Sequence, residues 1–330
     1  MMRFRTEYSP HPAALRLDPR RPVVLVGSCF SDNIGARMRE AMWDATVNPC
    51  GTLFNPASMA RAVSLALMTD PAPELEKTLF CATDGGTDIW RSWDFPTKFF
   101  GLTREECLSR CAAACAELRE ALMRADALLL TFGTAWVYTL ADEPGRVVAN
   151  CHKLPAARFL RRRMGVEEIE EMWSATAGAL RALRPDVKMI LTVSPVRHLR
   201  DGFEGNSLSK ATLRLACDAL CADMPLTDYF PASEILTDDL RDYRFYASDL
   251  LHPSEDAERY IFGKFQERYL DESGRALLEE ALSVSRMCSH RSLLEGTPAD
   301  TARRAAAEAR LEAFLARNPG LTPLRTSRNQ

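Results

Sequence analysis

The sequence has no apolar run long enough to cross a membrane and no large excess of charge of either sign. Its apolar stretches, such as Ala127–Thr131, fall far short of the roughly 18 residues that a spanning helix needs. The 42 Lys and Arg residues against 45 Asp and Glu leave a formal charge of −3, so no basic field indicates nucleic-acid binding. We therefore expect neither a membrane span nor a nucleic-acid partner.

The ten cysteines include no Cys-x-x-Cys pair, the usual spacing of zinc and thioredoxin-like redox sites. Cys107, Cys111 and Cys115 recur every fourth residue, as do Cys217 and Cys221, which places each set along one helix face. The N-terminus has a basic start without an apolar stretch behind it, so we expect no signal peptide. This pattern favours a cytoplasmic protein with reduced, mostly buried thiols and with no metal or cofactor.

Short continuous apolar runs alternate with amphipathic segments, which is typical of buried parallel strands joined by helices. We expect strands at 22–27, 45–47, 127–131 and 187–193. We expect helices at 31–42, 56–68, 103–124, 167–183, 208–222 and 254–270, hairpins at 78–94 and 137–149, and a proline-broken connection at 228–236. The fold class predicted is α/β, with a mostly parallel central sheet between two helical layers.

The chain changes character after about Asp271. Residues 271–330 are rich in Ala, Arg and Glu, show no strand pattern and end in a polar tail. We predict one α/β domain over residues 1–270 and a helical extension over 271–330. Whether the extension covers a site as a lid or makes a dimer contact is open, as is the oligomeric state.

Ser28 follows the first apolar run directly, in Gly27-Ser28-Cys29. Ligands of open parallel sheets bind at the carboxyl ends of the strands, and the start of the next helix favours an anion. A serine here is placed to act as a nucleophile, but this segment taken alone is explained better by use of the serine as a simple helix N-cap.

Asp249 stands three residues before His252, just ahead of the last core helix. An aspartate at this spacing can accept a hydrogen bond from one imidazole nitrogen, which leaves the other free to take a proton from a serine. The alternative is an ordinary surface loop in which the aspartate caps a helix.

Taken in order, these segments and several others resemble the GSCFA-domain proteins, which are similar to the SGNH (GDSL-like) hydrolases. The resemblance runs from Phe4 to about Phe265. Its motifs are residues 26–35 (VGSCFSDNIG), 48–56 (NPCGTLFNP), 131–138 (TFGTAWVY), 150–155 (NCHKLP), 192–198 (TVSPVRH), 241–246 (RDYRFY) and 249–254 (DLLHPS).

The resemblance implies an SGNH-like, three-layer fold of the flavodoxin type, with Ser28 as the nucleophile and Asp249 and His252 completing a catalytic triad. It also implies that the backbone amides of Ser28 and Gly51 hold the oxyanion. A glycine at position 51 agrees with this, because it lets backbone approach a ligand closely.

The chain departs from the SGNH pattern at its third motif, where Gly133-Thr134-Ala135 carries alanine in place of the oxyanion-binding asparagine. Loss of one such donor costs roughly 3–4 kcal/mol of transition-state stabilisation. Thr134, Asn48, Asn150 and His152 are the candidate replacements. Pro96 is a second departure, because the family commonly has His-Ser after Asp-Phe.

Further polar residues near the expected strand ends are candidates for substrate binding. They are Asn48, Asn150, His152, Lys153, Arg197 and His198. Cys29 is a minority candidate for the nucleophile, if His252 lowers its pKa. The basic run at 158–163 fits a solvated face better than a phosphate site.

We expect a serine-dependent hydrolase that removes an acetyl or short acyl group from a carbohydrate or other small alcohol. Two alternatives stay open. One is an acyltransferase that uses the same triad, and the other is a non-catalytic glycan- or lipid-binding module on a hydrolase fold.

Overall fold

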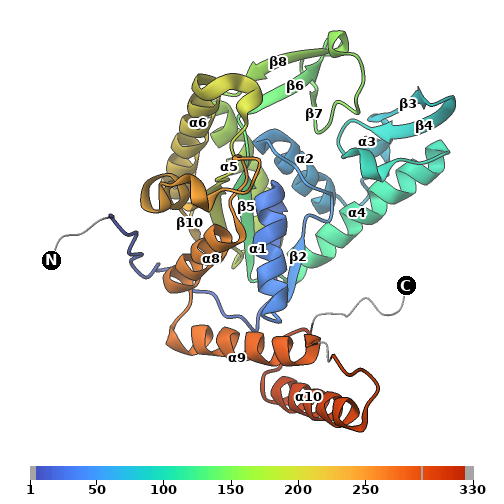
Figure 1. Cartoon of the computed structure of the whole chain (residues 1–330). Coiled ribbons are helices and arrows are strands. Elements are labelled where there is room, and N and C mark those ends of the chain that lie inside the picture. Colours follow the sequence, from blue (N-terminus) through green and yellow to red (C-terminus); the bar gives the residue numbers. More distant parts are fainter. Residues whose placement is uncertain (1–4, 291–292, 324–330) are drawn as a thin grey trace.

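The computed structural model describes residues 5–290 and 293–323 (Figure 1). Its centre is a five-stranded parallel sheet in the order β10-β9-β5-β1-β2. The strands are β1 (Val23–Gly27), β2 (Ala45–Val47), β5 (Ala127–Phe132), β9 (Lys188–Val193) and β10 (Thr227–Tyr229). Taken in chain order, this is the 2-1-3-4-5 arrangement of a doubly wound sheet. The winding direction reverses between β1 and β5, so a ligand is expected at the carboxyl ends of these two strands.

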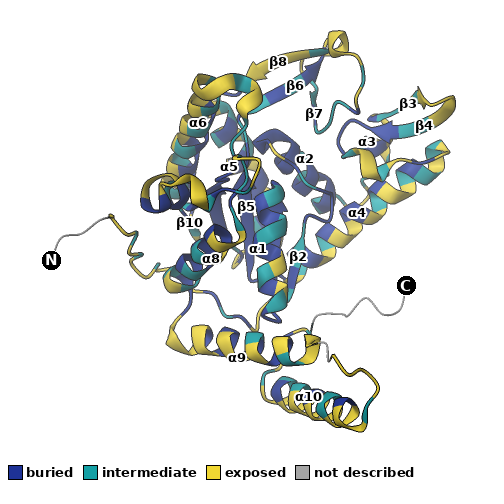
Figure 2. Cartoon of the chain, viewed as in Figure 1, coloured by how far each residue is buried: buried dark blue, intermediate teal, exposed yellow. Residues whose placement is uncertain are grey.

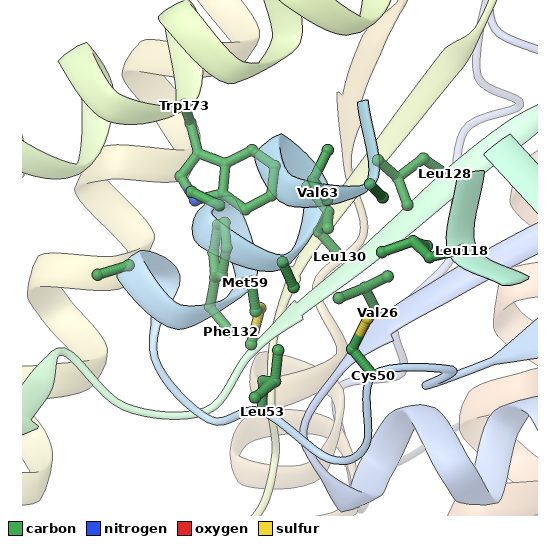
Figure 3. Packing of buried hydrophobic residues seen from close by; sticks show 14 of the residues in the cluster. Val26, Cys50, Leu53, Met59, Val63, Leu118, Leu128, Leu130, Phe132 and Trp173 are labelled. Atoms are coloured by element: carbon green, nitrogen blue, oxygen red, sulfur yellow. The ribbon is translucent and has the colours of Figure 1, made fainter. Parts of the chain in front are cut away.

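Alternate residues of the strands pack into two separate cores, one on each face of the sheet. Val24, Val26, Leu128 and Leu130 face the larger core, where Trp173 is completely buried (Figure 3). Four helices cover this face: α2 (Pro56–Leu67), α4 (Arg104–Arg124), α5 (Val166–Leu183) and α6 (Gly202–Asp223). Burial of each large apolar side chain contributes about 1.5–3 kcal/mol, so this layer holds the sheet in place.

The opposite face of the sheet carries the smaller core, to which Val23, Leu25 and Leu129 contribute. It is covered by α1 (Cys29–Glu40), α8 (Glu255–Tyr269) and the π-helical turn η4 (Ile235–Leu240), which continues α7 (Ala232–Glu234). Figure 2 shows the strands buried between the two helical layers. The predicted three-layer α/β/α fold is therefore confirmed.

Two small antiparallel sheets lie outside the central sheet, one between α2 and α4 in the chain and one directly after β5 (Figure 1). One pairs β3 (Leu79–Asp84) with β4 (Thr87–Ser92), and the other has the order β7-β6-β8. The second is formed by β6 (Trp136–Leu140), β7 (Val147–Val148) and β8 (Phe159–Arg163). Short helical segments complete the connections: α3 (Ala72–Glu76), η1 (Thr97–Phe99), η2 (Ala156–Arg158), η3 (Leu199–Asp201) and η5 (Tyr243–Phe245).

The predicted helical extension is confirmed by α9 (Glu272–Ser289) and α10 (Pro298–Arg317). Both lie at the end of the molecule away from β6–β8 (Figure 1). Phe314 and Leu277 pack there with Met42, just beyond the last turn of α1, and Thr322 N donates to Met42 O at 2.7 Å. Ser28 caps the other end of α1, so this placement does not fit a lid over Ser28.

Two expectations differ from the structure. Residues 227–229 form the edge strand β10 at the start of the expected proline-broken connection, and α6 begins at Gly202 instead of residue 208. The basic residues of β8 are exposed, which agrees with the expected solvated face, and the Arg161 guanidinium also lies over the rings of Trp136 and Tyr138 in β6. In the part of the chain that the structure describes, no helix combines the length and apolar character that crossing a bilayer requires.

Candidate active site at the carboxyl edge of the sheet

Ser28 lies between the end of β1 and the start of α1, the position at which an open parallel sheet binds ligands. Its side chain caps the helix by accepting from Phe30 N at 3.4 Å, and the residue is fully buried. Its amide donates to Thr131 O at 3.2 Å. No hydrogen bond joins Ser28 Oγ to an imidazole within residues 5–290 and 293–323. The serine is thus held in place by both the sheet and the helix.

Asp249 and His252 form a compact pair in the loop before α8. Asp249 Oδ2 lies 2.6 Å from His252 Nδ1, and its Oδ1 accepts from the amides of Leu251 at 2.9 Å and His252 at 3.0 Å. These amide and imidazole donors lower the pKa of the Asp249 carboxyl to about 2. The carboxylate is therefore ionised at neutral pH and fixes the imidazole by Nδ1, which leaves Nε2 available for proton transfer.

His198 and Arg197 connect this pair to the region of Ser28. Arg197 N donates to Leu251 O at 3.2 Å, next to His252 in the chain. A Cβ atom placed on Gly133 would lie 3.3 Å from Ser28 Cβ and 3.4 Å from His198 Nε2. The structure therefore brings Ser28, His198 and the Asp249–His252 pair to one edge of the sheet. Their action as a catalytic unit remains a prediction.

The two predicted oxyanion amides both have backbone partners. Ser28 N is the last donor between β1 and β5, and Gly51 N donates to Asn48 O at 2.7 Å to close a turn. Gly51 has a φ of 81°, and a Cβ there would lie 2.8 Å from Pro96 Cγ. The segment that approaches Gly51 closely is thus residues 96–99 of the same chain. A substrate oxygen would have to share these amides or displace their partners.

Asn48 and Thr134 are committed to the framework of the site. Asn48 Oδ1 accepts from Gly27 N at 2.8 Å, and its Nδ2 donates to Asp32 Oδ1 at 2.8 Å, which ties β1 to α1 and β2. Thr134 Oγ1 accepts from Trp136 N and lies 3.1 Å from Ser209 Oγ. Their polar atoms therefore already have partners without a substrate.

Asn150, His152 and Lys153 lie in the loop after β7. Asn150 Oδ1 accepts from His152 N at 2.6 Å. The His152 ring is buried against Phe80 and Trp93, with Nε2 2.9 Å from Ser92 O and Nδ1 3.2 Å from Thr97 Oγ1. Burial lowers the pKa of His152 to about 4. Lys153 is exposed, with a φ of 59°. The packing of His152 indicates a structural role for this ring.

Arg197 stacks on the aromatic residues beside His252. Its guanidinium lies 4.4 Å from the centroid of the Tyr246 ring and donates to Tyr246 Oη at 2.9 Å. Tyr246 forms an isolated antiparallel β-bridge with Pro253, the residue after His252, and the nearby Tyr243 is 60% exposed. An aromatic and cationic surface therefore borders the His252 loop on its solvent side.

Lys210 of α6 is a site residue that the sequence analysis missed. Its partly buried side chain donates through Nζ to Gly133 O at 2.8 Å and to Ser194 O at 2.7 Å, which joins the loops after β5 and β9. Burial lowers its pKa to about 7. Lys210 precedes the buried Leu213 and Cys217 by three and seven residues, which places it on the same face of α6 as these apolar side chains. A lysine on the apolar face of a predicted helix was the signal that could have identified it.

The cysteines next to the site do not favour thiolate chemistry. Burial, followed by the charge of Asp32, raises the pKa of Cys29, which argues against its use as the nucleophile. Cys107, Cys111 and Cys115 line the buried face of α4, as their spacing predicts.

The GSCFA family model matches residues 22–265. No curated protein matched the sequence. Among solved structures, a carbohydrate esterase family 3 protein from Talaromyces cellulolyticus is 9% identical, covers 80% of this chain and 99% of its own, and has a TM-score of 0.35. An acetyl esterase mutant with an acetate ion is 10% identical, with coverage of 80% and 99% and a TM-score of 0.36. Likenesses this distant do not bear on the activity of this chain.

Proposed function

Because the chain belongs to the GSCFA family, whose motifs resemble those of the SGNH hydrolases, we propose that it is a serine-dependent carboxylic ester hydrolase. Ser28 is the nucleophile, His252 the general base and Asp249 the residue that orients His252. The observation that carries the proposal is the 2.6 Å contact between Asp249 Oδ2 and His252 Nδ1 at the sheet edge where Ser28 follows β1.

The proposed reaction has two steps. In the first, His252 Nε2 takes the Ser28 proton as Oγ attacks the ester carbonyl, and the same proton then leaves with the alcohol. In the second, His252 takes a proton from water, which attacks the acyl group on Ser28. The acid departs and Ser28 recovers its proton. Ionised Asp249 stabilises the imidazolium formed in each step.

The surroundings of Ser28 favour a short acyl group. These surroundings are crowded, because even a Cβ added to Gly133 would lie 2.9 Å from Phe54 O, 3.3 Å from Ser28 Cβ and 3.4 Å from His198 Nε2. Such crowding disfavours a long acyl chain, so we take the acyl group to be short, such as acetyl. The exposed Tyr243 ring, 5.5 Å from the Arg197 guanidinium, offers a face on which a sugar or other small alcohol can lie.

Ester hydrolysis and covalent labelling together test the proposal. The wild-type protein is expected to hydrolyse p-nitrophenyl acetate and to react with a fluorophosphonate probe at Ser28. Ser28→Ala should abolish labelling, and His252→Gln should lower kcat by about 10³–10⁴ while the fold is retained. Asp249→Asn should lower kcat by about 10⁴. Undiminished hydrolysis by Ser28→Ala would contradict the mechanism.

The complete burial of Ser28 favours a second candidate, a non-catalytic glycan-binding module. A folded wild-type protein that neither reacts with the fluorophosphonate nor hydrolyses the ester, but binds an oligosaccharide in calorimetry, would support this function instead. An acyltransferase would use the same first step, with a second alcohol in place of water. Mass spectrometry of products formed with added glycerol or glucose would detect the acyl transfer.

A further inference from the structure

The environment of Ser28 provides few free donors for a developing oxyanion. The amides of Ser28 and Gly51 donate to Thr131 O and Asn48 O. Stabilisation of an oxyanion requires donors that are already aimed at the place where the charge develops. At least one further donor is therefore expected beside Ser28 in an active hydrolase.

The four side chains considered as replacements for the missing asparagine are all committed elsewhere. The contacts described above engage Thr134 with Ser209, Asn48 with Gly27 and Asp32, Asn150 with His152, and His152 with Ser92 and Thr97. Each would lose an existing contact before it could bind substrate. This cost makes them poor donors.

His198, in contrast, has a ring nitrogen that is not engaged in any hydrogen bond among the described residues. This atom, Nε2, is shielded from solvent. A buried polar atom without a partner costs about 1–3 kcal/mol, so its retention calls for an explanation. A Cβ added to Gly133 would lie 3.4 Å from His198 Nε2 and 3.3 Å from Ser28 Cβ, so these two groups are neighbours beside Gly133. An oxygen carried on Ser28 and directed at His198 would give Nε2 the partner that it lacks.

The His198 ring is held in this orientation. Asn206 Oδ1 accepts from His198 N at 2.9 Å, and the ring meets Phe54 edge to face with centroids 6.0 Å apart. Lys210 fixes the loops on both sides through Gly133 O and Ser194 O. A donor fixed in advance needs no reorganisation during the reaction, which is what oxyanion stabilisation requires.

The charge state of His198 also suits a donor. Burial, with a smaller contribution from the charge of Lys210, lowers the pKa of His198 to about 4. His252 and Arg161 act in the same direction, and Asp201 opposes them. The ring is therefore neutral at working pH, and in the tautomer that carries its proton on Nε2 it can donate a hydrogen bond without releasing a proton to the substrate.

We propose that His198 Nε2–H donates to the oxyanion formed on Ser28 and takes the place of the missing asparagine donor. This inference rests on the proposed hydrolase function. It assigns a direct contact with the reacting atoms to a residue that the sequence analysis named only as a candidate for substrate binding. No bond to His198 forms or breaks, and its proton stays on the ring.

Substitutions that keep or remove the donor test the inference. His198→Leu removes the donor and should lower kcat for p-nitrophenyl acetate by about 10²–10³ with little change in KM. His198→Gln keeps an N–H at similar reach and should remain within about tenfold of the wild-type kcat. His11→Leu, at an exposed histidine, is the matched control. If His198→Leu does not fold by circular dichroism, His198→Met serves as the donor-free variant.

The outcomes separate this inference from the proposed function. Loss of kcat in His198→Leu with recovery in His198→Gln supports the donor role. An equal loss of kcat in both variants would show that His198 acts as a base or only in packing. An unchanged kcat in His198→Leu would show that His198 takes no part in the reaction. Either result overturns the donor role of His198 but leaves the proposed hydrolase function standing. A wild-type protein without hydrolysis or Ser28 labelling overturns the proposed function, and this inference with it.

Discussion

The burial of His152 predicts a measurable dependence of stability on pH. The side chain is 4% exposed, with its ring against Phe80 and Trp93. Burial is the main cause that lowers the pKa of His152 to about 4, and the charge of Arg91 adds to it, whereas the contact with Ser92 O opposes it. Protonation of this ring is therefore much harder in the folded chain than in the unfolded one.

The sign and size of the effect follow from proton linkage. The unfolded chain takes up the proton near the ordinary pKa of 6.5 and the folded chain only near 4. The contribution of His152 to stability is therefore fully present above about pH 6.5, and it is lost progressively as the pH falls towards 4. Between about pH 7.5 and about pH 4.5, this one ring should remove about 2.5 kcal/mol from the free energy of unfolding.

Urea unfolding of the wild type and of His152→Gln at these two pH values measures the effect. Glutamine does not titrate, so the variant should lose about 2.5 kcal/mol less stability than the wild type on acidification, whatever its stability at neutral pH. His198, with a similarly lowered pKa, contributes equally to both proteins and cancels. His11→Gln, at an exposed position, should behave as the wild type. Equal losses in wild type and His152→Gln would refute the burial argument and return His152 to the candidates for substrate contact.

Three further predictions concern the framework of the site and the extension. Burial lowers the pKa of Lys210 to about 7, so the unfolded chain binds this proton more tightly than the folded chain. The free energy of unfolding should therefore rise by about 2 kcal/mol between about pH 7 and pH 9. Urea titrations of Lys210→Met should not show this rise. Asn48→Ala leaves Gly27 N without its acceptor and places alanine at a φ of 47°, so it should lower the free energy of unfolding in urea by about 2–4 kcal/mol. Asn48→Gly should recover about 1 kcal/mol of this loss, because glycine adopts a positive φ without strain. Equal losses in the two variants would show that the positive φ is not a source of strain. Phe314→Ala removes packing near Met42 and should lower the free energy of unfolding by about 3–5 kcal/mol, measured as a lower Tm. Ester hydrolysis should not change. A large loss of kcat would show that the C-terminal extension affects the active site.

Most of the central fold could be predicted because its signals are local. The apolar runs of β1 and β5 and the N-caps Asn55, Thr103 and Ser254 each depend on a few neighbouring residues, and the caps accept the expected backbone hydrogen bonds. The edge strand β10 was missed because its residues, Thr-Asp-Tyr, contain no apolar run and are only partly buried. It becomes a strand by pairing with β9, a partner far away in the chain.

The candidate site could be predicted only where its geometry is local. The spacing of Asp249 and His252 predicted their contact, because both residues lie in one short loop. The positions of Lys210 and His198 depend on how the loops after β5 and β9 meet, and no local pattern specifies that. Gly51 shows the same limit. A glycine can adopt the positive φ found here, but the sequence did not indicate which residues approach it, because residues 96–99 belong to another loop.

Access to Ser28 requires movement, and the hydrogen bonds show which part of the site should move. Ser28 is fully buried, whereas the side chain of His252 is 42% exposed. Ser28 is fixed by β1, β5 and α1, while the His252 loop joins the β9 loop through the 3.2 Å bond between Arg197 N and Leu251 O. Exposed segments with few buried contacts open most easily, so we expect the loop at 247–252 to shift towards a bound substrate while Ser28 stays fixed. Hydrogen exchange should be fast at the amides of this loop and slow across 23–31, and a fluorophosphonate adduct should slow exchange in the loop; equal protection of both segments before labelling would contradict this division.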